Sequence, residues 1–383
     1  MAPTTKILLT GATGYVGGTL LHRLVNSSDP TIKSLTFDAL VRTDEAADKL
    51  KAAYGDRITT IKWAGLTDTE LIPDTSANYD IVINVGSGFI TDGALAFVRG
   101  LSRRVGKDDG TPAPWILQIS GCTNLADKPL TGTPYPDRVW DDADSGAVYE
   151  YERSQDALNP YPQRTTEVGV LTLADELGVN AVSLNTPLIF GEGSGLFNRQ
   201  GIIIPVLMRY TLMHGYGFKL TETANFDWVH VEDLADAYIL LVKLILEGRG
   251  DGGGGGTAIP RGKKGILFPA VDRALQTEIF ERCLDAAFEM GLLPREDTPR
   301  EKTIRQVPLK EIADEITAGL MDMAEQGWAG NKAMKGTVLR RLGWEPKHGR
   351  ESWVKDYRDE LVALKEGRRP YTLDSCIGTK EYE

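Results

Sequence analysis

The chain is poor in the residues that build metal sites and disulfide frameworks. Its 383 residues include only three cysteines and four histidines. The cysteines, Cys122, Cys283 and Cys376, lie far apart, and no Cys-x-x-Cys spacing occurs. We therefore expect reduced thiols in a cytoplasmic protein and no metal site.

Long apolar runs and an excess of positive charge are also missing. The longest apolar candidate, residues 238–246, contains Lys243 and is too short for a membrane span, which takes about 20 residues. Residues 1–6 lead straight into a strand-like segment without the apolar region of a secretory signal. The formal net charge of −11 disfavours nucleic acid and anionic membranes as partners. We expect the partner to be a small-molecule substrate.

Strand-like and helix-like segments alternate through the first half of the chain. The predicted strands are residues 7–9, 35–41, 58–63, 81–85, 115–119 and 181–184, and the predicted helices are residues 16–25, 45–54, 93–105 and 161–177. Strands that look buried and alternate with helices are typical of a parallel sheet covered on both faces. The sequence therefore predicts an α/β fold with a doubly wound parallel sheet.

The pattern changes after Gly191. We expect helices over residues 202–213 and 232–246, an extended segment over 226–230, and a glycine-rich surface loop over 248–256. Residues 266–365 are mostly helical in pattern, and the tail past Pro370 looks irregular.

A glycine-rich turn, Thr10 to Gly18, joins the first predicted strand to the first predicted helix. Its glycines, Gly11, Gly14 and Gly17, are spaced Gly-x-x-Gly-x-x-Gly. A diphosphate needs a close approach to the backbone, free N–H donors and the positive end of a helix dipole. A turn with these properties at a strand–helix junction predicts a dinucleotide site.

The end of the second predicted strand bears on the choice of dinucleotide. NAD is usually held there by a carboxylate, whereas NADP prefers an arginine for its additional phosphate. Asp38 falls inside the strand, and Arg42 stands where the 2′-phosphate would lie. The sequence favours NADP(H) over NAD(H).

Five segments in matching order resemble the extended short-chain dehydrogenase/reductases, the fold of the nucleotide-sugar epimerases and dehydratases. They are the turn at 10–18, residues 159–161 (Asn-Pro-Tyr), 185–191 (Asn-Thr-Pro-Leu-Ile-Phe-Gly), 226–235 (Phe-Asp-Trp-Val-His-Val-Glu-Asp-Leu-Ala) and 342–346 (Leu-Gly-Trp-Glu-Pro). Most of the matches fall within residues 5–245. Several motifs in the family's order carry more weight than any one of them.

The resemblance implies two domains with the substrate in the cleft between them. A Rossmann domain would comprise residues 1–190, with 226–246 returning to it, and a smaller, mostly helical substrate lobe would comprise 191–225 and 247–383. By analogy with the superfamily, the chain could form a homodimer. The implied cofactor-binding residues are Gly11, Thr13, Gly14, Tyr15, Val16, Gly17, Arg42, Leu66, Gly86, Ser120, Tyr161, Thr165, Pro187 and Ile189.

The chain departs from the family at the catalytic tyrosine. The family places a lysine four residues after this tyrosine, where it holds the ribose and lowers the tyrosine pKa. Here Thr165 follows Tyr161 at that spacing, and Arg164 is the nearest cation that could replace the lysine. Tyr149, four residues before Arg153, is a less suitable tyrosine, because the chain from it to the next strand is too long for one helix.

The serine or threonine that accompanies the tyrosine is ambiguous. The strand at 115–119 leads into Ser120-Gly121-Cys122-Thr123, and either Ser120 or Thr123 could bond a substrate carbonyl. Cys122 at this position is better explained as a small buried thiol than as a nucleophile, because no histidine lies nearby in the sequence.

Two further departures concern the ligands. The arginine that grips the diphosphate of a nucleotide sugar is replaced by Phe226, and Gly65 stands where the family often has an aspartate near the adenine. An aromatic residue in place of a cation favours a less charged, more apolar substrate.

Three functions are compatible with these features. The first is NADP(H)-dependent oxidation or reduction of a carbonyl or alcohol on a small organic molecule, with Tyr161 as proton donor or acceptor. The second is a nucleotide-sugar epimerase or dehydratase. The third is a non-catalytic NADP-sensing regulator, similar to the NmrA-like proteins of the same superfamily.

Overall fold

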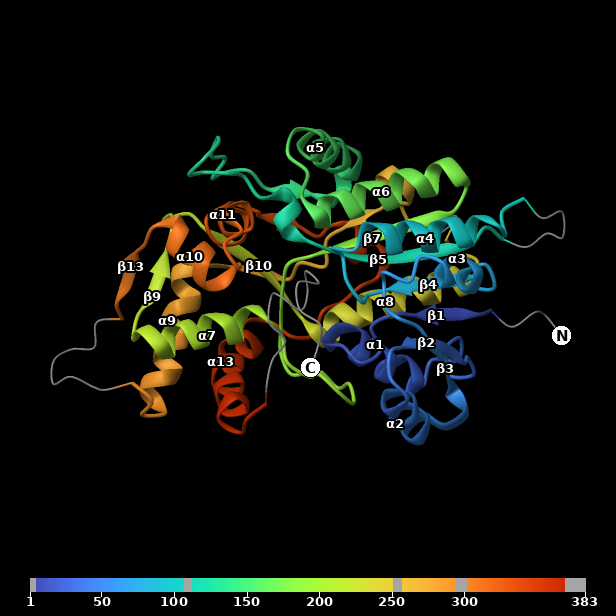
Figure 1. Ribbon diagram of the computed structural model, residues 1–383, viewed down its shortest axis with the longest axis horizontal. Helices are drawn as coiled ribbons and strands as arrows, with labels where there is room; N and C mark the ends of the chain where they lie inside the picture. Colours follow the sequence, from blue (N-terminus) through green and yellow to red (C-terminus); the bar gives the residue numbers. More distant parts are fainter. Residues whose placement is uncertain (1–4, 107–111, 251–256, 294–301, 369–383) are drawn as a thin grey trace.

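The computed structural model describes residues 5–106, 112–250, 257–293 and 302–368. Cys376, most of the glycine-rich stretch and the C-terminal tail lie outside the described residues. Figure 1 shows two lobes side by side, one built around a large sheet and the other around a set of helices.

The larger lobe contains a seven-stranded sheet whose strands all run parallel, in the order β11-β7-β5-β4-β1-β2-β3. The strands are β1 (Ile7–Leu9), β2 (Phe37–Val41), β3 (Ile58–Lys62), β4 (Ile81–Asn84), β5 (Trp115–Gly121), β7 (Asn180–Thr186) and β11 (Ile266–Leu267). The predicted Rossmann-type fold is confirmed.

Both faces of this sheet are covered, because its central strands carry apolar side chains without interruption. In β1, Ile7 and Leu9 pack into one core, and Leu8 packs into the core on the opposite face. Figure 1 shows the two helix layers on either side of the sheet. One layer contains α1 (Tyr15–Val25), α2 (Asp44–Tyr54) and α8 (Val231–Leu246), and the other contains α3 (Leu71–Ser76), α4 (Thr91–Ser102), α5 (Ser145–Leu158) and α6 (Pro162–Leu177).

The second lobe has a separate apolar core. At its centre the rings of Trp228 and Trp353 stack with centroids 5.1 Å apart, and Phe190 meets both rings edge-on. The strands of this lobe are β8 (Leu188–Phe190), β9 (Gly217–Lys219), β10 (Asn225–His230), β12 (Asp272–Leu275) and β13 (Ile304–Gln306). Its helices are α7 (Ile203–His214), α9 (Gln276–Glu289), α10 (Leu309–Ile316), α11 (Met321–Trp328) and α13 (Arg350–Lys365).

The boundary between the lobes differs from the predicted one. β10, at the start of the segment predicted to return to the Rossmann domain, pairs with β8 and β12 in the second lobe. Conversely, some of the chain predicted to belong to the substrate lobe lies with the large sheet. Strand β11 extends that sheet by pairing with β7. The helix α12 (Val338–Leu342) and Trp344 pack into the core beneath α8. A two-stranded ladder, β6 (Trp140–Asp141) with β14 (Met334–Lys335), and short 3₁₀ helices at Gly55–Arg57, Cys122–Leu125, Asp142–Asp144 and Gly262–Lys264 complete the described elements. No described helix is both long enough and apolar enough to cross a bilayer.

The buried carboxyl of Glu360 on α13 gives a prediction for stability. Glu360 is 4% exposed, and burial raises its pKa to about 7 from 4.5, although it accepts a hydrogen bond from Gln200. A raised pKa in the folded state stabilises the fold at low pH, and this contribution is lost as pH rises through about 7. We expect the free energy of unfolding of Glu360→Gln, relative to that of the unmodified chain, to rise by up to about 3 kcal/mol as the pH is raised from 5 to 8.

Urea unfolding at the two pH values measures this difference. The exposed Glu281 on α9 supplies a matched control, since Glu281→Gln should follow the pH dependence of the unmodified chain. Parallel pH profiles for Glu360→Gln and the unmodified chain would contradict the prediction.

Candidate functional site

The glycine-rich turn lies at the carboxyl end of β1 and is packed too closely at Gly11 and Gly17 to admit a side chain at either position. A Cβ on Gly17 would lie 2.2 Å from the Gly11 carbonyl oxygen. Gly11 itself has φ +74°, and a Cβ there would lie 2.9 Å from the Val85 carbonyl oxygen. The turn therefore packs directly against the end of β4, and its glycines allow a ligand to approach the backbone closely.

The N-terminus of α1 has the properties of an anion site. Gly14 is its N-cap, no side chain caps it, and no acidic residue stands in its first turn. The positive end of the helix dipole therefore remains without an anionic partner on the helix itself. This arrangement fits the pyrophosphate of a dinucleotide, which the first-turn amides of Tyr15, Val16 and Gly17 would hold. The Gly14 amide donates instead to the Gly11 carbonyl oxygen at 2.8 Å, so Gly14 would contribute only the close approach of its backbone.

Thr10 fixes the turn relative to the next strand. Its hydroxyl donates to Asn84 Oδ1 at 2.7 Å and accepts from the backbone amides of Val85 and Gly86 at 3.1 and 3.0 Å. Gly86, predicted to touch the cofactor, is thereby held beside the turn. Thr13 is partly exposed in the turn.

The side chains of Tyr15 and Val16 pack into the protein interior, so only the backbone amides of these residues can bind a ligand. Both side chains are buried, and the Tyr15 hydroxyl donates to the Gly191 carbonyl oxygen. Pro187, between β7 and β8, is buried, and Ile189 on β8 is partly buried. The motif at 185–191 therefore connects to the glycine-rich turn through Tyr15.

Arg42 follows β2 directly and is exposed. Its side chain passes beside Gly65, because a Cβ on Gly65 would lie 4.0 Å from Arg42 Cδ. Leu66, the next residue, is packed against α4, where its carbonyl oxygen would lie 2.0 Å from a Cβ on Gly93. The missing aspartate at position 65 thus leaves space beside the arginine.

A tyrosine–threonine pair lies just beyond the carboxyl end of β5. Tyr161, the N-cap of α6, donates its hydroxyl proton to Thr123 Oγ1 at 3.2 Å. Parallel strands end at one edge of a sheet, so this pair and the glycine-rich turn share an edge. Burial raises the pKa of Tyr161 to about 12, although the Thr123 bond and the charge of Arg164 lower it in part.

Arg164 is buried beside this pair. It is 2% exposed, its Nε donates to the Asn124 carbonyl oxygen at 3.0 Å, and its guanidinium carbon lies 5.9 Å from the centre of the Tyr161 ring. Within the described residues it forms no ion pair with a carboxylate. The structure thus places a cation close to the tyrosine.

Thr165, at the spacing of the family's lysine, is turned elsewhere. Its single hydroxyl proton is shared between Asp156 Oδ1 at 2.8 Å and the Tyr161 carbonyl oxygen at 3.2 Å. Its hydroxyl hydrogen is therefore already used within the protein.

The Ser120 hydroxyl bonds other residues than Tyr161, and its role beside the substrate stays a prediction. Its hydroxyl donates to Glu167 Oε2 at 2.9 Å and accepts from Asn124 at 3.0 Å inside a buried polar network. Glu152 belongs to the same network, where burial and the neighbouring Glu167 raise its pKa well above the usual range. Thr123 is therefore the hydroxyl that accompanies the tyrosine.

Cys122 is a buried thiol, as predicted. Burial raises its pKa to about 11, which leaves it protonated and unreactive near neutral pH. No group of three or more potential metal ligands occurs among the histidine, cysteine and acidic residues that the structure describes.

Two residues near the candidate site, Gln163 and Lys332, were not predicted from the sequence. Gln163 accepts the Thr123 hydroxyl proton at 2.8 Å. Lys332, 1% exposed, holds its ammonium 4.0 Å from the centre of the Phe226 ring, where the family has an arginine. Burial lowers the pKa of Lys332 to about 8. No local motif marks Lys332, because it reaches Phe226 from the segment that follows α11.

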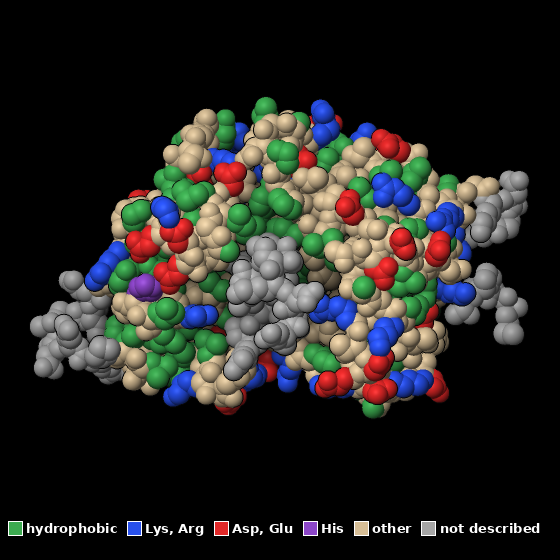
Figure 2. Space-filling model, in the orientation of Figure 1, with side chains coloured by type: hydrophobic (Ala, Val, Ile, Leu, Met, Phe, Trp, Pro, Cys, Tyr) green, Lys and Arg blue, Asp and Glu red, His purple; other side chains and the backbone are tan. Residues whose placement is uncertain are grey.

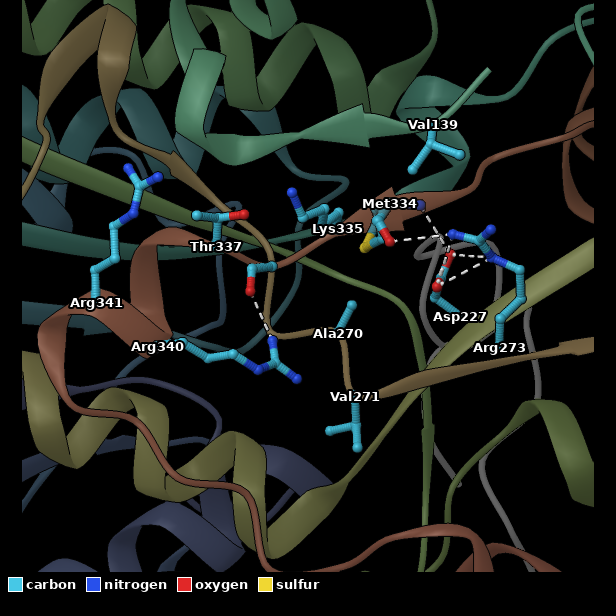
Figure 3. A pocket seen from close by; sticks show the side chains of 11 residues that line it. Val139, Asp227, Ala270, Val271, Arg273, Met334, Lys335, Thr337, Arg340 and Arg341 are labelled. Carbon is cyan, nitrogen blue, oxygen red and sulfur yellow. Dashed lines mark hydrogen bonds and ion pairs between the residues drawn. The ribbon is translucent and has the colours of Figure 1, made fainter. Parts of the chain in front are cut away.

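A separate cleft of about 690 Å³ lies over β12 and β14 (Figure 3). Arg273, Lys335, Arg340 and Arg341 line it, together with the apolar side chains of Val139, Ala270, Val271 and Met334. Arg273 forms an ion pair with Asp227, which also lines the cleft. Lys335 forms an ion pair with Asp141, which does not line it. The cleft shares no lining residue with the glycine-rich turn or the Tyr161–Thr123 pair, so we distinguish it from the candidate active site.

Comparison with known proteins agrees with this geometry. Residues 144–251 match the model of the NAD dependent epimerase/dehydratase family. A curated relative, "Oxidase ucsJ" from Acremonium sp, is 25% identical over 353 residues, which cover 90% of this chain and 93% of that protein.

Solved structures share the fold at low sequence identity. The dTDP-glucose 4,6-dehydratase DesIV of Streptomyces venezuelae, as a double mutant with NAD and DAU bound, superposes with a TM-score of 0.61 at 14% identity, covering 95% of this chain and 100% of that chain. Vestitone reductase from alfalfa gives a TM-score of 0.57 at 15% identity, covering 95% and 99%.

Proposed function

We propose that the chain is an NADP(H)-dependent oxidoreductase of the extended short-chain dehydrogenase/reductase superfamily, supported by the family model that matches residues 144–251, the curated oxidase relative and the shared fold. Its substrate would be a small, relatively apolar organic molecule with a carbonyl or alcohol group. The observation that carries this proposal is the hydrogen bond from Tyr161 to Thr123 at the sheet edge that holds the glycine-rich turn.

The nicotinamide, when bound, supplies or accepts the hydride. Tyr161 then exchanges the proton with the substrate oxygen, and Thr123, through its hydrogen bond to the Tyr161 hydroxyl, holds that hydroxyl in place. Because the Tyr161 pKa is about 12, its hydroxyl remains protonated near neutral pH and is suited to donate. Reduction of a carbonyl is therefore the direction that this residue supports, with Arg164 stabilising the phenolate left behind.

Arg42 supports the choice of NADP(H) over NAD(H). We expect Arg42→Gln to raise the Kd for NADPH roughly tenfold to a hundredfold, the effect of losing a hydrogen bond to a charged group. The Kd for NADH should stay unchanged. Quenching of tryptophan fluorescence measures both constants.

A lysine on the adjacent helix provides the control for this experiment. Lys51 on α2 is exposed and pairs with Asp56. Lys51→Gln should leave both constants unchanged, and equal losses of NADPH and NADH affinity in Arg42→Gln would argue against a 2′-phosphate contact.

The surroundings of Phe226 bear on the substrate class. Phe226 is buried in the core of the second lobe, and apolar side chains gather where the two lobes meet on the face shown in Figure 2. These features support an apolar substrate. The ammonium of Lys332 over the Phe226 ring restores a positive charge and favours a second candidate, a nucleotide-sugar epimerase or dehydratase.

Two measurements separate these candidates. NADPH absorbance is followed with a panel of aldehydes, ketones and enones, and turnover of at least one compound is expected. Binding is also titrated with UDP-glucose and dTDP-glucose, where no binding is expected. Tight NADPH binding without turnover of any compound would instead favour a sensing role.

A further inference from the structure

We infer that Gln163 is a positioning residue for the Tyr161–Thr123 pair, which deepens the proposed function and rests on it. Gln163 is on the first turn of α6, two residues after the tyrosine, and is 9% exposed. Its Oε1 accepts the hydroxyl proton of Thr123 at 2.8 Å. Thr123 can therefore use its oxygen to accept from Tyr161.

The backbone around Gln163 leaves room for its amide. A Cβ on Gly121, the last residue of β5, would lie 2.8 Å from Gln163 Nε2 and 2.9 Å from Oε1. A Cβ on Gly88, in the loop after β4, would lie 3.4 Å from Nε2. Two glycines from neighbouring strand ends thus make the space in which this amide meets Thr123.

The chemistry of an amide suits the two states of the tyrosine. With Oε1 toward Thr123, the Thr123 oxygen accepts from a protonated Tyr161. Once Tyr161 has given up its proton, rotation of the amide brings Nε2 toward Thr123, and the Thr123 hydroxyl is then free to donate to the phenolate. The glutamine amide can both accept from Thr123 and donate to it, so Gln163 supports both directions of the hydrogen-bond chain. A lysine at position 163 could only donate.

The ionisation of Tyr161 tests this role without any substrate. A lysine at position 163 brings a positive charge and can only donate to Thr123, which directs the Thr123 hydroxyl proton to the phenolate oxygen. We expect Gln163→Lys to lower the Tyr161 pKa by at least one unit, a tenfold change in its ionisation constant.

¹³C NMR of protein labelled at tyrosine Cζ follows this titration. The chain has 13 tyrosines, so the Tyr161 resonance is assigned by its loss in Tyr161→Phe. Gln155 lies on the neighbouring helix α5, and Gln155→Lys adds the same charge without contacting Thr123. An unshifted Tyr161 titration in Gln163→Lys, or an equal shift in Gln155→Lys, would overturn the inference.

A second variant separates positioning from folding. Gln163→Leu removes the acceptor with little change in volume. With the best compound of the carbonyl panel, kcat should fall roughly fivefold to tenfold, the effect of one neutral hydrogen bond, while the Kd for NADPH stays constant. Unchanged kcat would overturn the role of Gln163, whereas absence of turnover in the unmodified chain would count against the proposed function alone and leave the NMR result intact.

Discussion

Tyr161→Phe is expected to lower kcat by about 10²–10⁴-fold, the usual contribution of a positioned proton donor. The substitution removes one oxygen atom, which in the structure bonds only to Thr123 among the described residues. NADPH affinity should remain within a few-fold of that of the unmodified chain, because the pyrophosphate cradle lies on another element. In the reduction direction, kcat of the unmodified chain should stay flat between pH 6 and pH 9, since the Tyr161 pKa is about 12.

Tyr149 provides the matched control. It is a buried tyrosine on α5 whose hydroxyl pairs with Thr172 at 2.6 Å, away from Thr123. Tyr149→Phe should keep kcat and lose only a modest amount of stability. Equal turnover in Tyr161→Phe and the unmodified chain would show that another group transfers the proton.

Gly17→Ala is expected to weaken NADPH binding by roughly a hundredfold, equivalent to about 2.7 kcal/mol. The new Cβ would lie 2.2 Å from the oxygen and 2.6 Å from the carbon of the Gly11 carbonyl. Both are backbone atoms, so the turn must shift away from the helix end that holds the pyrophosphate. Overpacking of this kind also costs about 1–3 kcal/mol of stability. Fluorescence titration and urea unfolding measure the two effects.

A glycine inside a helix gives the comparison. Gly146 lies in the first turn of α5, and a Cβ there meets no atom within 4 Å. Gly146→Ala should therefore leave NADPH affinity intact and raise stability slightly, because alanine is the better helix former. If Gly17→Ala bound NADPH as tightly as Gly146→Ala, the cradle would not lie at this turn.

The sequence predicted the sheet well where local signals agree with packing. The apolar strands β1 and β4, which end at Leu9 and Asn84, are recognisable because both faces of a central parallel strand are buried. The same holds for the helices next to them, which begin or end within a few residues of the predicted positions. β11 escaped prediction because its two residues carry no periodic signal.

The candidate site was predictable only in part. The motif order indicated Tyr161, whose catalytic role stays a prediction, and Thr123 was one of two alternatives for its partner. The choice between Ser120 and Thr123 depends on which way each side chain points, and the buried carboxyl of Glu167, which accepts from Ser120, favours Thr123. Gln163 follows no family pattern, and its role is visible only beside Gly121 and Thr123.

The substrate argument from Phe226 shows a similar limit. The sequence indicated the loss of a cation at that position, but Lys332, 106 residues away, places its ammonium over the same ring. A charge supplied from a distant segment leaves no trace in a local motif, so the two candidate substrate classes need a direct binding experiment.

A crystal structure of the chain with NADPH would test the central claim most directly. The account predicts the pyrophosphate within hydrogen-bonding distance of the amides in the first turn of α1, with the 2′-phosphate beside Arg42 and the nicotinamide facing Tyr161. Density for the dinucleotide at any other place, or a folded chain that binds neither NADPH nor NADH, would contradict it.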